Sequence, residues 1–173
     1  MSAWSALEAV TADEVIERLS AGEVETGHWL DRALTACGGT VPQAFRNDLA
    51  REIGRAVLEI RADLSANGRL LLYRGLDRAP ERGRARGIHW TADPDVAAGF
   101  GPHVLALEVD PADVDWVATV IRRIGWPKER EISLRPAASP AGDPLDEPAG
   151  QVLDRDPEEG LAGREDEAPE PDH

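Results

Sequence analysis

Residues 64–75, LSANGRLLLYRG, contain the change of pattern that decides the fold. Before this stretch, apolar side chains recur every three or four residues, which is the spacing of an amphipathic helix. Asn67-Gly68 then breaks the helix, and the apolar run from Leu70 to Leu72 leaves no polar face, as in a buried strand. The sequence therefore predicts an α+β domain in which an N-terminal helical layer packs on a small mixed or antiparallel β-sheet.

Three helices are expected before Gly68. Thr11 or Asp13 can cap the first, and the second stops at Gly38-Gly39, where left-handed backbone is free of steric cost. The third begins after Pro42 and is long, with one buried face. Its apolar positions are Phe45, Leu49, Ile53, Ala56, Val57, Ile60 and Leu64.

After Gly68 the pattern is mainly that of strands. We expect strands at residues 69–74, 103–109, 116–121 and 129–135. A short helix, residues 93–100, should start on a capping Thr91 or Asp93 with Pro94 in its first position. Residues 1–136 then form a single domain, with a helical lobe (1–67) and a β-rich part (68–136).

Residues 137–173 differ from the rest of the chain in composition. They hold 12 acidic residues against two arginines and so carry −10 of the net charge of −14. With six prolines and no aromatic residue, they cannot bury enough apolar surface to offset the entropy of ordering. We expect a disordered acidic Pro-rich tail, which is either a solubilising spacer or a segment that docks a partner.

Charge and cysteine content narrow the functional classes. Residues 1–136 carry a net charge of only −4, and the acidic tail repels polyanions, which argues against nucleic acid as a partner. Cys37 is the only cysteine, and His28 and His103 lack ligand-like spacing, so we assign no metal. No apolar run approaches the length that spans a membrane. We therefore expect a cytoplasmic protein without a membrane partner.

The segment EREISL, residues 129–134, holds two carboxylates. In a strand, Glu129, Glu131 and Ser133 would share one face, while the apolar residues between them face the core. Enzymes use such carboxylate pairs in reactions in which C1 of a sugar develops positive charge. One carboxylate stabilises that centre, and the other orients or deprotonates the nucleophile. The alternative is an edge strand whose solvated charges deter aggregation.

Two further segments are candidates for binding a ligand. Arg74 follows an apolar strand and could bind a pyrophosphate bidentately or form a buried ion pair, while Gly75 permits close backbone approach or forms a turn. His89-Trp90-Thr91 offers an aromatic surface and a hydroxyl just before a helix N-terminus, which favours anions. The alternative there is a capping threonine beside a core tryptophan.

The order of these segments resembles the ADP-ribosyltransferase fold of the arginine, serine/threonine, glutamate type. Those enzymes present an arginine on the first core strand, an S-T-S-like strand leading into a helix, and an E-x-E strand near the end of the domain. The chain is most similar to small bacterial and phage proteins of this fold with Y-R-G, W-T-x-D, A-x-x-F and E-x-E segments. The matching residues are 73–75, 90–93, 97–100 and 129–131. The resemblance covers about residues 70–136.

The resemblance implies a role for each matching residue, with NAD as the substrate that donates ADP-ribose. Arg74, with Gly75, would anchor the NAD phosphates and ribose, and Thr91 would support the catalytic glutamate. Glu131 would be that glutamate and would promote loss of nicotinamide, while Glu129 would prepare an acceptor side chain, with arginine favoured. This chain departs from S-T-S, because an imidazole, His89, stands where the pattern has its first hydroxyl.

Three aromatic residues are implicated by the same resemblance. Trp90 would lie in the cofactor-binding segment, and Phe100 would line the nicotinamide pocket unless it belongs to the core. Trp126 falls in the turn before the E-x-E strand, where this fold recognises its target, and an exposed tryptophan there suits protein docking. A tryptophan tucked beneath the turn is the alternative.

Two classes of function remain. The first is a mono-ADP-ribosyltransferase that moves ADP-ribose from NAD to a protein acceptor, with NAD glycohydrolysis as a close variant. The second is a catalytically inactive nucleotide-binding or protein-interaction module of the same fold. The resemblance requires the side chains of Arg74, Thr91 and Glu131 to line one cleft, which makes their relative placement the structural test.

Overall fold

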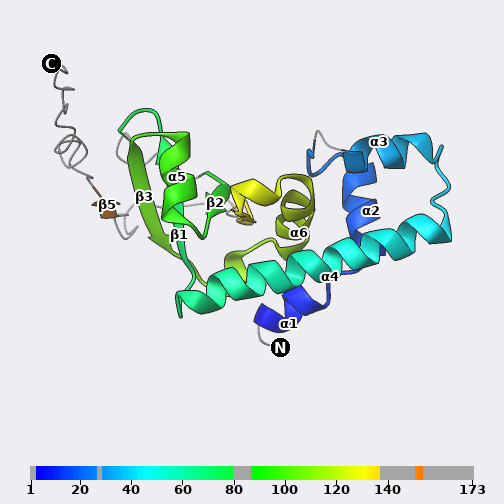
Figure 1. Cartoon of the computed structure of the whole chain (residues 1–173), viewed down its shortest axis with the longest axis horizontal. Helices are drawn as coiled ribbons and strands as arrows, with labels where there is room; N and C mark the ends of the chain where they lie inside the picture. Colours follow the sequence, from blue (N-terminus) through cyan, green and yellow to red (C-terminus); the bar gives the residue numbers. More distant parts are fainter. Residues whose placement is uncertain (1–2, 27–28, 80–86, 137–150, 154–173) are drawn as a thin grey trace, which may run out of the picture.

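The computed structural model describes residues 3–26, 29–79, 87–136 and 151–153 and has the expected α+β architecture. Helices α1 (Ala3–Glu8), α2 (Ala12–Ser20), α3 (Trp29–Ala36) and α4 (Gln43–Ala66) precede the first strand. The helix α4 runs the length of the molecule, from α3 at one end to the sheet at the other (Figure 1). A helical layer therefore does accompany a small sheet, as the sequence predicts.

Local sequence signals explain where the N-terminal helices begin and end. Thr11 caps α2 through a capping box with Glu14, in which each side chain binds the backbone of the other residue. Asn67 follows the last residue of α4, and Gly68 has a positive φ of 62°, which glycine adopts without strain. Five of the seven apolar positions predicted for α4 are buried: Leu49, Ile53, Ala56, Ile60 and Leu64.

The prediction of a strand at residues 116–121 is wrong. These residues begin helix α6 (Trp116–Gly125), whose N-cap is Asp115. The Asp115 carboxylate accepts a hydrogen bond from the Ala118 backbone N–H at 3.0 Å and a second from Arg18 at 2.8 Å. The β-branched residues of this run favour strands, but their burial between α4 and the sheet stabilises the helix instead.

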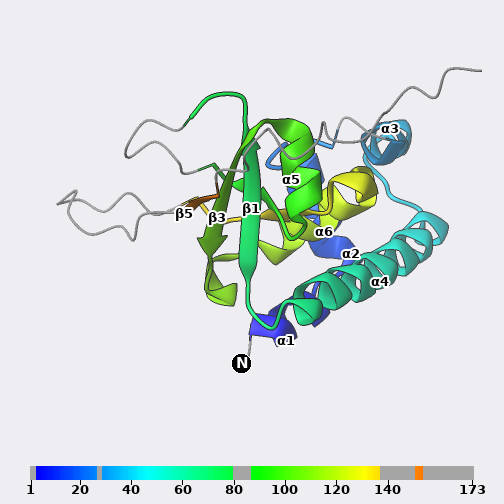
Figure 2. The same cartoon turned by 60° about the vertical axis from the view of Figure 1, so that its left-hand side comes forward.

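The sheet is antiparallel, with strand order β4-β2-β1-β3-β5. Its members are β1 (Leu71–Leu76), β2 (His89–Thr91), β3 (His103–Glu108), β4 (Glu131–Ser133) and β5 (Gln151–Leu153). Between β2 and β3 lies α5 (Pro94–Phe100), capped by Asp93 as expected, and it lies against β1 (Figure 2). The strands that carry the three resembling motifs, β1, β2 and β4, are thus neighbours.

The strand predicted at residues 129–135 is shorter than expected. Glu129 ends a 3-10 helix, η2 (Pro127–Glu129), and Arg130 is in the left-handed conformation with φ 48°. Only Glu131, Ile132 and Ser133 form β4. The expected alternation therefore holds for Glu131 and Ser133 but is wrong for Glu129, because a left-handed residue interrupts the pleat between the two glutamates.

One hydrophobic core joins the helices to one face of the sheet. Leu72, Trp90, Leu105 and Ile132 come from the strands, and they pack in the same cluster as the buried residues of α4 and α6. Trp116 on α6 also meets Trp4 of the unpredicted helix α1, with ring centroids 6.0 Å apart. The side chains of β1, β2 and β4 that alternate with these core residues lie on the other face of the sheet.

Two expectations about the ends of the fold need comment. Residues 151–153 of the predicted tail form β5, which pairs with β3, so the prediction of disorder is wrong there. The rest of that predicted tail, residues 137–150 and 154–173, lies outside the described residues. Within the part of the chain that the structure describes, every helix is too short or too polar to cross a membrane.

Capping of α6 should contribute measurably to stability. Asp115→Ala removes both the N-cap and the partner of Arg18, and we expect the free energy of unfolding to fall by about 1–2 kcal/mol. Urea denaturation followed by circular dichroism measures this. Asp110→Ala, which removes the exposed cap of the 3-10 helix η1 (Pro111–Asp113), is the control. Equal midpoints for the two variants would contradict the role assigned to Asp115.

Candidate functional site

Glu131 is buried, and neighbouring polar side chains contact one oxygen of its carboxylate. Its side chain is 8% exposed, and its Oε1 lies 2.5 Å from Nδ1 of His89. The Ser133 hydroxyl donates to the same oxygen at 3.0 Å, and Nε of Arg122 lies 3.7 Å from it. Among the described residues, the hydrogen bonds and the ion pairs of this carboxylate all involve Oε1.

The sheet register explains why these groups meet. His89 is opposite Ser133, and Thr91 is opposite Glu131, in the antiparallel pair of β2 and β4. Directly opposed residues share a face, so all four side chains lie on the face that alternates with Trp90 and Ile132. Arg122 reaches the same place from α6, which packs beside β4.

The Thr91 hydroxyl contacts the backbone next to Glu131 and not the Glu131 carboxylate. Its hydroxyl donates to the backbone carbonyl of Arg130 at 3.3 Å and accepts from the Asp93 N–H at 3.2 Å. It thus joins the start of α5 to the turn before β4. The direct contacts to Glu131 come instead from His89 and Ser133.

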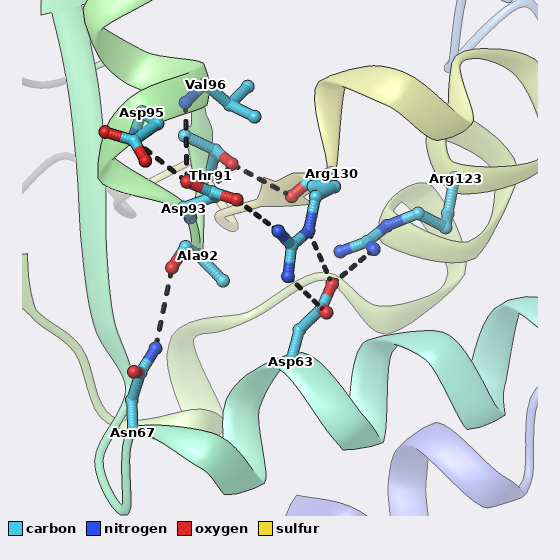
Figure 3. A network of polar contacts seen from close by, with 9 residues as sticks. All are labelled: Asp63, Asn67, Thr91, Ala92, Asp93, Asp95, Val96, Arg123 and Arg130. Atoms are coloured by element: carbon cyan, nitrogen blue, oxygen red, sulfur yellow. Dashed lines mark hydrogen bonds and ion pairs between the residues drawn. The ribbon is translucent and has the colours of Figure 1, made fainter.

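The left-handed residue Arg130 is held by carboxylates from two other elements (Figure 3). Its guanidinium pairs with Asp63 of α4, through Nε at 3.2 Å and also through Nη2, and with Asp93 before α5. Asp63 also accepts from the buried Arg123 at 2.6 Å. These ion pairs stabilise the backbone conformation that separates Glu129 from Glu131.

The pKa values of Asp63 and Glu129 are shifted in opposite directions. Burial alone would raise the pKa of Asp63, but hydrogen bonds from Arg130 and Arg123 outweigh it and lower the pKa below its usual value. Burial and the nearby charge of Glu131 raise the pKa of Glu129, although Arg122 opposes this. Glu129 therefore keeps its proton to a higher pH than an ordinary glutamate.

Arg74 does not join Thr91 and Glu131. Tyr73 is the residue of β1 that opposes Thr91, so Arg74 belongs to the other face of the sheet. Its guanidinium packs directly on Gly87, where a Cβ atom would lie 0.8 Å from Nη1. That nitrogen is buried without a hydrogen-bond partner among the described residues. Arg74 therefore does not line one cleft with Thr91 and Glu131, although the resemblance requires it.

Gly75 occupies the face of β1 that Glu131 shares, but α5 covers it. A Cβ atom at this position would lie 1.9 Å from the carbonyl oxygen of Ala97. The glycine is therefore required for close contact between the strand and the helix, whereas the sequence left open a close approach to a ligand or a turn.

The three aromatic residues have separate environments. Trp90 is buried in the core, and its indole N–H donates to the Gly87 carbonyl at 2.6 Å. Phe100, at the end of α5, is 55% exposed and thus outside the core. Trp126 is half-buried beneath Arg122, whose guanidinium carbon lies 4.9 Å from its ring centroid. The partner of Trp126, Arg122, is also the residue whose Nε lies 3.7 Å from Glu131.

Sequence reasoning did not identify His89, Ser133 or Arg122 as partners of Glu131. The motif marks His89 only as a departure from a hydroxyl, although its position two residues before Thr91 puts both side chains on the same face of a strand. Ser133 could be placed on the face of Glu131 by alternation. Arg122 could not, because it belongs to a helix that the pattern did not predict.

Other possible sites lie away from Glu131. A hollow of about 400 Å³ is lined by Trp4, Arg69, Leu70 and Val109, at the end of the sheet nearest α1. In the described part of the chain, no three His, Cys, Asp or Glu side chains form a cluster that could hold a metal ion.

Comparisons with known proteins identify no relative. No protein-family model matches the chain, and neither a curated protein nor a solved structure does. A function for the chain can therefore be inferred only from the site and from the resemblance of its motifs.

Removal of the Asp63 carboxylate should destabilise the turn before β4. Asp63→Asn leaves the buried Arg123 without its ionised partner, and we expect a loss of about 3 kcal/mol in the free energy of unfolding at pH 7. Because the folded-state pKa of Asp63 is lowered, this stabilisation is present above the usual aspartate pKa of about 3.9 and is lost as the pH falls through the lowered value.

Urea denaturation at several pH values measures this difference. Asp48→Asn is the control, because it removes an exposed ion pair with Arg51 on the same helix and should cost less than about 0.5 kcal/mol. A loss at pH 7 no larger than that of Asp48→Asn, or a loss that does not decrease in acid, would refute the assignment.

Proposed function

We propose that the chain is a mono-ADP-ribosyltransferase that transfers ADP-ribose from NAD to a protein acceptor, with arginine as the modified residue, and releases nicotinamide. The observation that carries this proposal is the Glu131 carboxylate, which is buried and is contacted at Oε1 by His89 and Ser133, with no hydrogen bond to its other oxygen from the described residues. A cytoplasmic location is part of the same proposal, supported by the single cysteine.

A carboxylate held in this way suits the cleavage of a glycosidic bond to nicotinamide. As that bond breaks, positive charge develops at C1 of the ribose, and a fixed negative charge stabilises it more than mobile water does. Two donors fix one oxygen of Glu131, so little rotamer freedom has to be lost when the other oxygen meets the ribose. Burial strengthens the interaction by excluding water.

Glu129 is suited to a proton transfer from the acceptor. It lies near enough to Glu131 for the charge of that residue to raise its pKa, yet it stands on η2 outside the strand. A carboxyl group with a raised pKa is a stronger base when ionised. In the proposed reaction, Glu129 accepts a proton from the acceptor guanidinium as nitrogen bonds to C1 and nicotinamide departs.

The order of the strands also supports the proposal. The Y-R-G, W-T-x-D and E-x-E segments belong to β1, β2 and the turn into β4, which are adjacent in the sheet. The W-T segment leads directly into helix α5, as in the family pattern. Trp126 and Arg122 lie on the Glu131 side, where a protein acceptor would approach.

A second candidate is favoured by Arg74. Because this arginine lies on the face of the sheet opposite Glu131 and is covered by Gly87, it is badly placed to anchor the phosphates of an NAD molecule beside Glu131. Since the resemblance requires Arg74, Thr91 and Glu131 to line one cleft, this placement counts against an NAD site and favours a catalytically inactive nucleotide-binding or protein-interaction module. Turnover decides between the two.

Nicotinamide release tests the enzyme directly. Purified protein with NAD and an arginine-rich protein should release nicotinamide, and Glu131→Gln should lower the rate by at least about a hundredfold because the negative charge is lost. Chromatographic quantification of nicotinamide is the measurement. Glu108→Gln, on the exposed end of β3, is the matched control. Equal rates for wild type and Glu131→Gln would refute the assignment, and no release by wild type would favour the inactive module.

The role of Glu129 is tested by separating cleavage from transfer. We expect Glu129→Gln to lower transfer to an arginine acceptor by about tenfold or more, because the base is lost, while release of nicotinamide to water falls much less. Incorporation of labelled ADP-ribose and nicotinamide release are measured in parallel. Lys128→Gln, an exposed neighbour on η2, is the control. Parallel loss of both activities would contradict a role specific to the acceptor.

A further inference from the structure

We propose that His89 is a positioning residue for Glu131 and that its protonation slows nicotinamide release, so that turnover rises with pH as the imidazole loses its charge. This inference rests on the proposed function and deepens it, because it assigns a regulatory role to a residue that occupies the place of a hydroxyl. It starts from the 2.5 Å contact between Nδ1 of His89 and Oε1 of Glu131.

The geometry assigns the proton at this contact. An ionised carboxylate only accepts hydrogen bonds, so Nδ1 carries the hydrogen in both the neutral and the charged form of His89. The Ser133 hydroxyl is the second donor to Oε1. Loss of the imidazole charge therefore leaves the orientation of the carboxylate intact and changes only the electrostatic environment of Glu131.

The two side chains differ in their access to solvent. The His89 side chain is 44% exposed, whereas that of Glu131 is 8% exposed. The imidazole can therefore exchange protons with water while it keeps its contact with a carboxylate that is shielded from water. A serine or threonine hydroxyl at this position would donate a hydrogen bond but would have no charge to change near neutral pH.

Among the described residues, three charged groups and one hydroxyl surround His89. Glu131 and Ser133 face it from β4, Glu129 acts on it from η2, and Arg122 approaches from α6. With neutral His89, two carboxyl groups face one guanidinium. With protonated His89, a second cation is added beside Glu131, and the negative charge available to the substrate is reduced.

The change in charge has a direct consequence for the proposed reaction. Glu131 stabilises a ribose centre that becomes positive only in the transition state, so a neighbouring cation opposes that stabilisation. Nicotinamide release should be slow where His89 is charged and fast where it is neutral. The rate is therefore compared across the range in which imidazole side chains generally change charge, about pH 5 to 8.

Three variants separate the hydrogen bond from the charge. His89→Asn keeps an N–H donor near the position of Nδ1 but cannot titrate, and His89→Ala removes both the donor and the charge. His103→Asn, on β3 away from Glu131, is the matched control. The rate of nicotinamide release from NAD is measured from pH 5 to 8.5 for each variant, with circular dichroism to verify folding.

We expect the wild type and His103→Asn to share a rate that rises about tenfold across this range. His89→Asn should keep a rate within about threefold of the wild-type maximum and lose the rise, whereas His89→Ala should be at least about tenfold slower at every pH. The same rise in His89→Asn as in wild type would overturn the proposal, as would an unchanged rate in His89→Ala.

A measurement without NAD distinguishes failure of this inference from failure of the proposed function. The NMR signals of the imidazole, assigned to His89 by their loss in His89→Asn, should differ in chemical shift between wild type and Glu131→Gln at the same pH, because the contact with an ionised carboxylate is lost. Identical chemical shifts would overturn the His89 inference even if the enzyme is active. Absence of nicotinamide release from folded wild type would overturn both the proposed function and the pH dependence of release, whatever the NMR spectra show.

Discussion

The carboxylate of Asp63 is the point on which the candidate site depends. It binds Arg130 and the buried Arg123 at the same time, and it belongs to α4, the helix that spans the molecule. Because an unpaired charge in such a place is costly, each of the three groups requires the other two. The long helix thereby determines the backbone of a turn that is far from it in sequence.

The consequence of this constraint is the separation of the two glutamates. Because Arg130 is in a left-handed conformation, Glu129 lies outside β4. The side chain of Glu131, the first residue of β4, contacts His89 and Ser133. An uninterrupted strand would instead point both carboxylates in one direction, at a cost from like-charge repulsion. The bend gives the two carboxylates different environments. The proposed function requires such a difference, because Glu131 would stabilise positive charge and Glu129 would accept a proton.

The sequence predicts more of the fold than of the site, for physical reasons. The face of α4 and the cap at Thr11 are local patterns, and the structure has both. The strand expected at residues 69–74 is found at residues 71–76, and within it only Leu72 is buried. The strand expected at residues 116–121 is wrong because burial outweighs the β-propensity of that run. The contacts of Glu131 depend on the register of β2 and β4, and that register is a tertiary property.

The two faces of the sheet limit how a dinucleotide could reach Glu131. On the Glu131 face, α5 touches β1 at Gly75, so the approach is confined to β2, β4 and the Arg122–Trp126 pair. On the opposite face, Arg74 packs under Gly87, whose carbonyl accepts the Trp90 indole hydrogen bond. Arg74 thus contacts the segment that leads into His89. A ligand beside Glu131 would obtain its polar contacts from β2, η2 and α6.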